Sequence, residues 1–209
     1  NHPELIPDYE AAVAGASQVI IIDNASQPGP ARQIESMLAR LNGSIASTSP
    51  VLQHTTACVH NDENRWFTAA CNQGLDYVTG DIVVMLNNDI QARPEWLVQV
   101  ERDCTPNVLT GPSLGLRIVA GLPLVYVEGW CVAGTRATWD RLMVPTPHVM
   151  IAGREGIRAG RYGPWDALNF EGPYWEDNDL CYRALQAGIG LVATSWPIHH
   201  KGGRTAGAL

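Results

Sequence analysis

Polar side chains follow two apolar runs of the sequence, and their types suit the binding of a nucleotide and a cation. The run at 19–22 leads into DNAS (23–26), and the run at 83–86 leads into NND (87–89). An Asp or Asn side chain can hydrogen-bond a base or a ribose, and a carboxylate can hold a hard divalent cation that bridges a diphosphate. Asp23 and its neighbour could equally cap the following turn. Two strands that end alike favour the nucleotide site.

Acidic and imidazole side chains also gather in two segments of the second half of the chain. The first is EDND at 176–179, which opens an expected helix, and the second is HHK at 199–201. Acids in a first helical turn interact favourably with the helix dipole by about 0.3–1 kcal/mol, and this structural role is sufficient for Glu176 and Asp179. A carboxylate can also act as a general base, a step worth about 10²–10⁴-fold in rate. Imidazole is a common ligand of divalent ions.

The elements that must position these groups alternate between strands and helices in the first half of the chain. Strands are expected at 19–23 and 81–89, and helices at 4–15, 28–43, 65–80 and from 93 onward. This alternation is typical of an α/β protein with a parallel sheet, in which ligands bind beyond the carboxyl ends of the strands. Both sets of strand-end polar groups are therefore expected at the same edge of the sheet.

The pattern changes after about residue 105. The elements expected here are strands within 124–134, a short helix at 135–143, a helix at 176–188, a last strand at 191–196 and a tail at 199–209. The stretch 144–172 is rich in Pro and Gly without a period, and long irregular loops are usually functional or mobile. Its arginines could close over a diphosphate or lie in a solvated loop: Arg154, Arg158 and Arg161.

The composition fits a single globular domain and argues against several classes of protein. Hydrophobic residues make up 45% of the 209 residues and charged residues 17%, which argues against disorder. No apolar run reaches the roughly 20 residues of a membrane span, and the net charge of −7 gives no strong signal for nucleic-acid binding. The five cysteines are scattered without a Cys-x-x-Cys pair, which favours reduced thiols in a cytosolic protein.

Five segments in this order resemble a family-2 glycosyltransferase with the GT-A fold. They are VIIIDNAS (19–26), ENRWFTAACNQG (63–74), DIVVMLNNDIQARPEWL (81–97), YWEDNDLCYRALQAG (174–188) and HHKGG (199–203). The resemblance extends over residues 1 to about 205, and NND paired with DNAS is most similar to rhamnosyltransferase-like members. It implies a Rossmann-like, mostly parallel sheet flanked by helices, with a smaller irregular part on the acceptor side.

The resemblance also implies a role for each matched residue. The nucleotide would be contacted by Asp23, Asn24, Arg65 and Asn88, and the helix that carries Asn72 would lie over it. A divalent cation, Mn²⁺ or Mg²⁺, would be held by Asp89 and His200. Asp177 would be the general base of an inverting transfer, kept ionised by the helix N-terminus. The sugar or the acceptor would be contacted by Trp130, Trp175 and Glu176. The family's Asp-x-Asp element is Asn-Asn-Asp here, so another metal ligand gains importance.

The expected organisation is a single GT-A domain over 1–209, with a nucleotide-binding half (1–105) and an acceptor or catalytic half (106–209). The family's first strand would precede Asn1. The donor would be a UDP-, dTDP- or GDP-linked sugar, and the acceptor a glycan, a lipid-linked or another molecule. A hexosyl- or rhamnosyltransferase of polysaccharide biosynthesis, in the cytoplasm or at a membrane surface, is expected.

Two other classes of protein share these features. A nucleotidyltransferase has the same α/β core and the same strand-end acids. A degenerate domain would hold a nucleotide or a glycan without turnover, which the reduced Asp-x-Asp element favours and Asp177 opposes.

Overall fold

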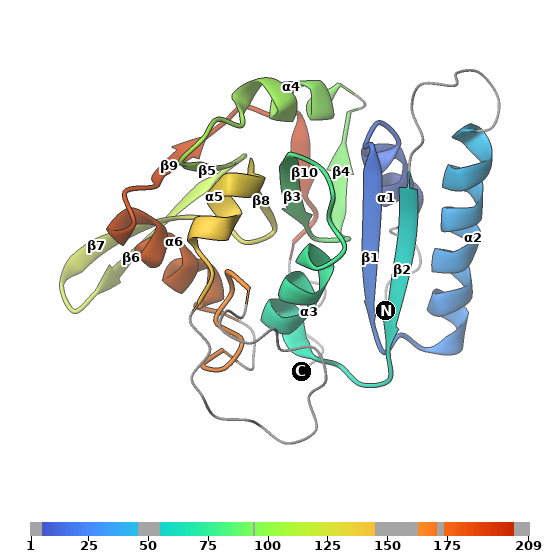
Figure 1. The fold of residues 1–209 in the computed structure, drawn as a ribbon, viewed down its shortest axis with the longest axis horizontal. Coiled ribbons are helices and arrows are strands. Elements are labelled where there is room, and N and C mark those ends of the chain that lie inside the picture. The colour runs from blue at the N-terminus through green and yellow to red at the C-terminus, as the bar shows by residue number, and fades with distance from the viewer. Residues whose placement is uncertain (1–5, 46–54, 94, 145–162, 171–173, 203–209) are drawn as a thin grey trace.

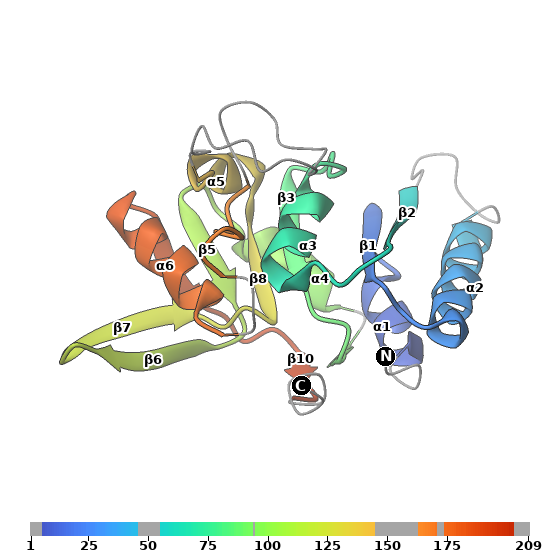
Figure 2. The same ribbon diagram turned by 90° about the horizontal axis from the view of Figure 1, so that it is seen from below.

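The structure is a computed structural model and describes residues 6–45, 55–93, 95–144, 163–170 and 174–202 of the 209. It extends from helix α2 (Pro28–Ile45) at one end to a hairpin of strands β6 (Leu114–Val119) and β7 (Leu122–Val127) at the other, as Figures 1 and 2 show. Helix α3 (Trp66–Leu75) lies between these ends. Within the described ranges, no helix is both long and apolar enough to cross a bilayer.

A parallel pair of strands forms the sheet at the α2 end of the molecule. The other elements here are helix α1 (Ile6–Val13), strand β1 (Gln18–Asn24) and strand β2 (Thr55–Asn61). Val19 of β1 packs with Met37 and Leu41 of α2, because the β-branched run of β1 offers side chains on both faces. The strand expected at 19–23 and the helices expected at 4–15 and 28–43 are confirmed within the described residues. Strand β2 was not expected.

A four-stranded sheet lies at the centre of the molecule, in the order β3-β8-β5-β9. Its strands are β3 (Ile82–Leu86), β5 (Val108–Gly111), β8 (Cys131–Thr135) and β9 (Gly190–Ala193). Strand β9 runs parallel to β5, whereas β8 runs antiparallel to both β3 and β5. The α/β class is confirmed, and β3, β5 and β9 run in the same direction, so that this sheet departs from the parallel arrangement at one strand. The cause is β8, which returns from β5 through the β6–β7 hairpin without the helical crossover that a parallel strand requires.

The first two residues of the stretch 199–209, which was expected to be a tail, belong to a strand. Strand β10 (Ile198–His200) pairs antiparallel with strand β4 (Ile90–Ala92), which directly follows the NND segment. A three-residue strand has little signal of its own, so the pairing depends on tertiary contacts. It brings the NND segment (87–89) and the HHK segment (199–201) together.

Two clusters of buried side chains form the core around the central sheet and its helices. The remaining helices are α4 (Trp96–Asp103), α5 (Arg136–Arg141) and α6 (Glu176–Gln186). Leu109, Val132 and Leu180 are fully buried in one cluster, and Ile90 and Trp96 in another. Gly188 follows α6 with a φ of +70°, a left-handed conformation that ends helices and favours glycine. The expected helix at 176–188 and its glycine stop are confirmed.

Candidate functional site

Asp89 and His200 form the first pair of predicted site residues that the fold brings together. The antiparallel register of β4 and β10 sets His200 opposite Ile90, next to Asp89. His200 Nε2 lies 2.9 Å from Asp89 Oδ1, and Lys201 N–H donates to the Asp89 carbonyl (2.8 Å). The Asp89 side chain is buried. His199 is exposed and lies opposite Gln91 in the register, where strand alternation turns its side chain to the other face.

Trp130 connects this pair to the turn between β7 and β8. Its ring stacks on the His200 imidazole, with ring centroids 5.1 Å apart and planes inclined by 5°. Trp130 Nε1–H donates to Glu128 Oε2 (2.9 Å), and the Ser113 hydroxyl donates to the same oxygen. The sequence predicts a sugar contact for Trp130, but one face of its ring is covered by His200. Glu128, which orients Trp130, was not predicted, because a single acid beside a glycine carries no motif.

Asp177 opens α6 on the other side of the same turn. Gly129 N–H donates to Asp177 Oδ2 (3.2 Å) and Asn178 N–H donates to Asp177 Oδ1 (2.8 Å). Burial raises the pKa of the Asp177 carboxyl, although these backbone hydrogen bonds oppose the rise. The helix N-terminus was expected to keep this group ionised, and burial outweighs that effect. A raised pKa makes the carboxylate a stronger proton acceptor.

Glu176 and Trp175 lie beside Asp177 at the start of α6. Burial raises the pKa of Glu176, and the adjacent Asp177 carboxylate raises it further. The Glu176 Oε2 atom is buried without a hydrogen-bond partner. The Trp175 ring is exposed on the surface, and the Arg117 guanidinium lies over it, 4.6 Å from the ring centroid. Arg117 was not predicted, because it lies inside an apolar hairpin sequence.

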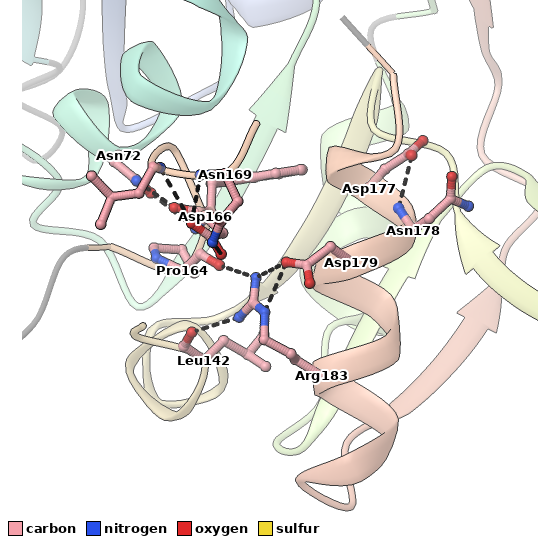
Figure 3. A network of polar contacts seen from close by, with 11 residues as sticks. Asn72, Leu142, Pro164, Asp166, Asn169, Asp177, Asn178, Asp179 and Arg183 are labelled. Atoms are coloured by element: carbon pink, nitrogen blue, oxygen red, sulfur yellow. Dashed lines mark hydrogen bonds and ion pairs between the residues drawn. The ribbon is translucent and has the colours of Figure 1, made fainter. Parts of the chain in front are cut away.

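The third acid of this segment, Asp179, has a structural role. Arg183 Nε donates to Asp179 Oδ2 (2.8 Å) one turn later on α6, and the same guanidinium donates to the carbonyls of Leu142 (3.1 Å) and Pro164 (2.7 Å). Figure 3 shows this network on the side of α6 away from Asp177. The helix-stabilising interpretation therefore fits Asp179, and α6 is fixed to the loop that precedes it.

Asp23 and Asn24 at the end of β1 form a separate polar group. Asp23 Oδ1 accepts from Ser26 N–H (3.0 Å) and Oδ2 lies 2.9 Å from His60 Nδ1. Burial alone would raise the pKa of Asp23, but the hydrogen bonds from Ser26 and His60 lower it. Asn24 Oδ1 accepts from Asn61 Nδ2–H (3.0 Å). The turn-capping interpretation is thus realised here, and His60 and Asn61 were missed together with β2.

The remaining predicted residues differ in their surroundings. Arg65 precedes α3 with an exposed side chain, and its backbone N–H donates to Asn24 Oδ1 (3.2 Å). Asn88 is exposed between β3 and β4. Asn72 is buried and exchanges two hydrogen bonds with the Trp165 backbone, at 2.7 and 3.0 Å, which supports its structural interpretation. Pro94, Arg154, Arg158 and Arg161 lie outside the described residues.

Comparison with known protein families gives a match in the first half of the chain. Residues 14–102 match the family described as Glycosyl transferase family 2. Residues 14–102 belong to this family. The matched range contains the groups around Asp23 and Asp89 and ends before Asp177 and His200. No curated protein matches the sequence of the chain.

A solved structure shares the fold of this chain. It is a mannosyltransferase, PcManGT from Pyrobaculum calidifontis, in complex with GDP-Man and Mn²⁺. The TM-score is 0.58 at 18% sequence identity, and the match covers 93% of this chain and 52% of that chain. The GT-A fold expected from the sequence is therefore confirmed. The chain spans about half the length of the solved protein.

The structure joins two of the three predicted groups of site residues. Residues 128–130 contact the Asp89–His200 pair through Trp130 and Asp177 through Gly129. The Asp23 group adjoins β2 and α3 instead. Within the described ranges, no group of three or more His, Cys, Asp or Glu side chains could hold a metal ion. Any cation at Asp89 and His200 would thus need ligands beyond the protein side chains described.

Proposed function

We propose that the chain transfers a sugar from a nucleotide-diphosphate sugar to an acceptor hydroxyl, with inversion at the anomeric carbon. One observation carries the proposal: the turn 128–130 contacts both the Asp89–His200 pair and Asp177. A carboxylate–imidazole pair suits the diphosphate end of a donor, and a half-buried carboxylate suits the acceptor end. The turn holds the two ends of the reaction on one rigid piece of backbone.

Asp89 and His200 are the side chains that would hold a divalent cation. Their oxygen and nitrogen atoms converge to 2.9 Å, and both are donor types that Mn²⁺ accepts. Two protein ligands are sufficient, because Mg²⁺ and similar ions in such sites keep waters and bind substrate phosphates. When bound, the cation would neutralise charge on the departing diphosphate. Asn87, whose amide nitrogen lies 3.5 Å from His200 Nε2, borders the same place.

Asp177 is proposed as the general base. The acceptor oxygen forms a bond to the anomeric carbon, the bond from that carbon to the diphosphate oxygen breaks, and the hydroxyl proton moves to Asp177. Each Asp177 oxygen accepts one backbone hydrogen bond and retains lone-pair capacity for a proton. Trp175 and Glu176 would border the position of the acceptor, and Trp130 would lie beside the sugar.

The donor nucleotide is proposed to lie at the polar ends of β1 and β3. Asp23 and Asn24 would contact the base, with Asn88 and Arg65 at its exposed side. Both halves of the chain contribute to one domain, because β3 precedes residue 105 and its sheet partner β8 follows it. The solved mannosyltransferase holds GDP-Man, which makes a GDP-linked sugar the first donor to test, before UDP- and dTDP-linked ones.

The test measures binding and turnover separately. GDP, UDP and dTDP are titrated calorimetrically with Mn²⁺ and with EDTA against wild type, Asp89→Ala and Asp177→Asn. Asp140→Asn on α5 is the matched control, since its carboxylate is exposed. We expect Asp89→Ala to weaken binding at least about tenfold with Mn²⁺, a loss of the size seen when metal sites are disturbed, and to have little effect with EDTA.

Turnover is followed as transfer to an acceptor or, until one is found, as donor hydrolysis. Asp177→Asn keeps the shape of the side chain and should lower the rate by about 10²-fold or more with nucleotide affinity unchanged. Equal affinity of wild type and Asp89→Ala under both conditions would exclude the metal role. Tight nucleotide binding by a wild type that turns over no donor would favour a binding domain. Retention of configuration in the product would exclude a direct inverting transfer.

A further inference from the structure

Arg117 reaches the candidate base from a different element, the β6–β7 hairpin. Its neighbours on β6, Leu116 and Ile118, are 63% and 66% exposed, and strand alternation turns Arg117 to the opposite face. There its guanidinium carbon lies 4.6 Å from the centroid of the Trp175 ring and 5.9 Å from that of Tyr126. An arginine over an aromatic face is attracted by the ring quadrupole. The hairpin therefore contacts the start of α6 through the Arg117 guanidinium on the Trp175 ring, and Tyr126 of the same hairpin lies near this guanidinium.

The backbone at the start of α6 is strained, and the side chain at the N-cap position does not stabilise it by a hydrogen bond. Trp175 occupies the N-cap position without a side-chain hydrogen bond to the helix. Tyr174 and Trp175 have φ values of +81° and +74°, a left-handed conformation that is costly for bulky residues and persists only where the surroundings enforce it. Both rings are exposed, so burial does not enforce it. The Arg117 guanidinium lies on the ring of one of them.

The charge of Arg117 also acts on the two carboxylates that follow Trp175. It lowers the pKa of Glu176 and of Asp177, against the larger effect of burial. It forms no ion pair with either carboxylate within 4.0 Å among the described contacts, and its buried Nε has no hydrogen-bond partner. The other titratable groups facing these acids are Cys71 and Cys181, whose thiols burial keeps neutral. Arg117 is thus the cation that acts on this pair.

We propose that Arg117 is a positioning residue for the candidate base: its stack on Trp175 holds the strained start of α6, and its positive charge acts on the nearby Asp177 carboxylate without an ion pair. The identity of Asp177 as base rests on the proposed function, whereas the stack and the charge effect do not. Arg117 acts through Trp175 and through space, so its removal should alter ionisation more than donor affinity.

The test reads the ionisation of Asp177 directly, without turnover. Carboxyl-carbon NMR titrations are recorded on the whole, unliganded protein, and the Asp177 signal is assigned by its absence in Asp177→Asn. Arg117→Gln should move the Asp177 and Glu176 midpoints to higher pH, because a carboxylate loses the cation that favoured it. Arg102→Gln on α4 removes the same charge from an exposed site paired with Asp103 and should leave both midpoints unchanged.

Two further variants keep the test decisive. Arg117→Lys keeps a positive charge, so its Asp177 midpoint should lie between those of wild type and Arg117→Gln. Trp175→Ala removes the ring on which Arg117 stacks but keeps the charge, and it should move the Asp177 midpoint in the same direction as Arg117→Gln. If Arg117→Gln does not fold, the Asp177 midpoint of Trp175→Ala tests the proposal in its place. An Asp177 midpoint that is the same in Arg117→Gln and wild type, or that moves equally in Arg102→Gln, would overturn the proposal.

The kinetic readout separates this proposal from the proposed function. In an active enzyme, the acidic limb of the kcat/KM profile should move to higher pH in Arg117→Gln, with nucleotide affinity unchanged. A shifted midpoint in a protein that transfers no sugar would contradict the proposed function and leave the role of Arg117 standing. An active enzyme whose Asp177 midpoint is the same in Arg117→Gln and wild type would contradict the role of Arg117 and leave the proposed function standing.

Discussion

Gly129 offers a way to displace the candidate base without changing any charge. A Cβ atom added at Gly129 would lie 3.2 Å from the Asp177 Cβ and 3.6 Å from its Oδ2. Carbon atoms in favourable contact lie about 3.5–4.0 Å apart, so in Gly129→Ala the Asp177 side chain must give by a few tenths of an ångström. The backbone itself tolerates the change, because Gly129 is not among the residues with positive φ.

The size of the effect follows from this displacement. A misplacement of about 1 Å can cost about 10²-fold in rate, so a few tenths should lower kcat roughly five- to tenfold. Overpacking of this kind costs about 1 kcal/mol, which leaves a domain of ordinary stability folded. Nucleotide affinity should be unchanged, since the new methyl group faces Asp177 rather than Asp89 or His200.

The assay compares kcat and calorimetric nucleotide affinity of Gly129→Ala with those of two other variants. Gly80→Ala is the control, because its new Cβ would make an ordinary contact of 3.5 Å with the Ile82 carbonyl. The second is Asp177→Ala, in which Gly129→Ala should cause no further loss, since the group it displaces is absent. Full activity of Gly129→Ala, or an equal loss in the Asp177→Ala background, would refute the assignment of the base.

Two further outcomes test the metal pair and the scaffold. His200→Ala should weaken Mn²⁺-dependent nucleotide binding, whereas His199→Ala, on the other face of β10, should have little effect; identical calorimetric behaviour would count against His200. Asn72→Ala should lower the free energy of unfolding by about 2–4 kcal/mol, because two groups of the buried Trp165 backbone lose their partner. Urea unfolding would show this as a lower midpoint, and Asn169→Ala, at an exposed site, should change it far less.

The elements with a strong pattern of their own could be predicted from the sequence. The β-branched run of β1 and the amphipathic helices α2 and α6 signal their class within one segment. Strand β2, with the sequence TTACVHN, has too few large apolar side chains to stand out, although its Thr and Val residues are a weak strand signal. Strand β10 forms only because β4 lies beside it. Both β2 and β10 form by pairing with a strand distant in the sequence, and their own residues do not indicate that partner.

The residues of the candidate site also divide into those that the sequence could predict and those that depend on tertiary contacts. Asp89, Asp177 and His200 could be named because they fall on segments that resemble known glycosyltransferases. Arg117 and Glu128 could not, because each acts through a partner distant in the sequence or through a neighbouring ring. Asp23 was placed correctly at a strand end, but its hydrogen bonds to Ser26 and His60 required β2.

The turn between β7 and β8 explains why the second half of the chain belongs to the same site. Asn87 N–H donates to the Trp130 carbonyl (2.8 Å) and Cys131 N–H donates to the Glu128 carbonyl (3.3 Å), so the turn is tied to the end of β3 and to itself. A displacement reaction needs a fixed separation between the group that takes the proton and the group that receives the leaving charge. Trp130 stacks on His200 and Gly129 donates to Asp177, and these are the groups proposed for the two roles. The adjacent residues Gly129 and Trp130 would therefore set the separation between Asp177 and the Asp89–His200 pair.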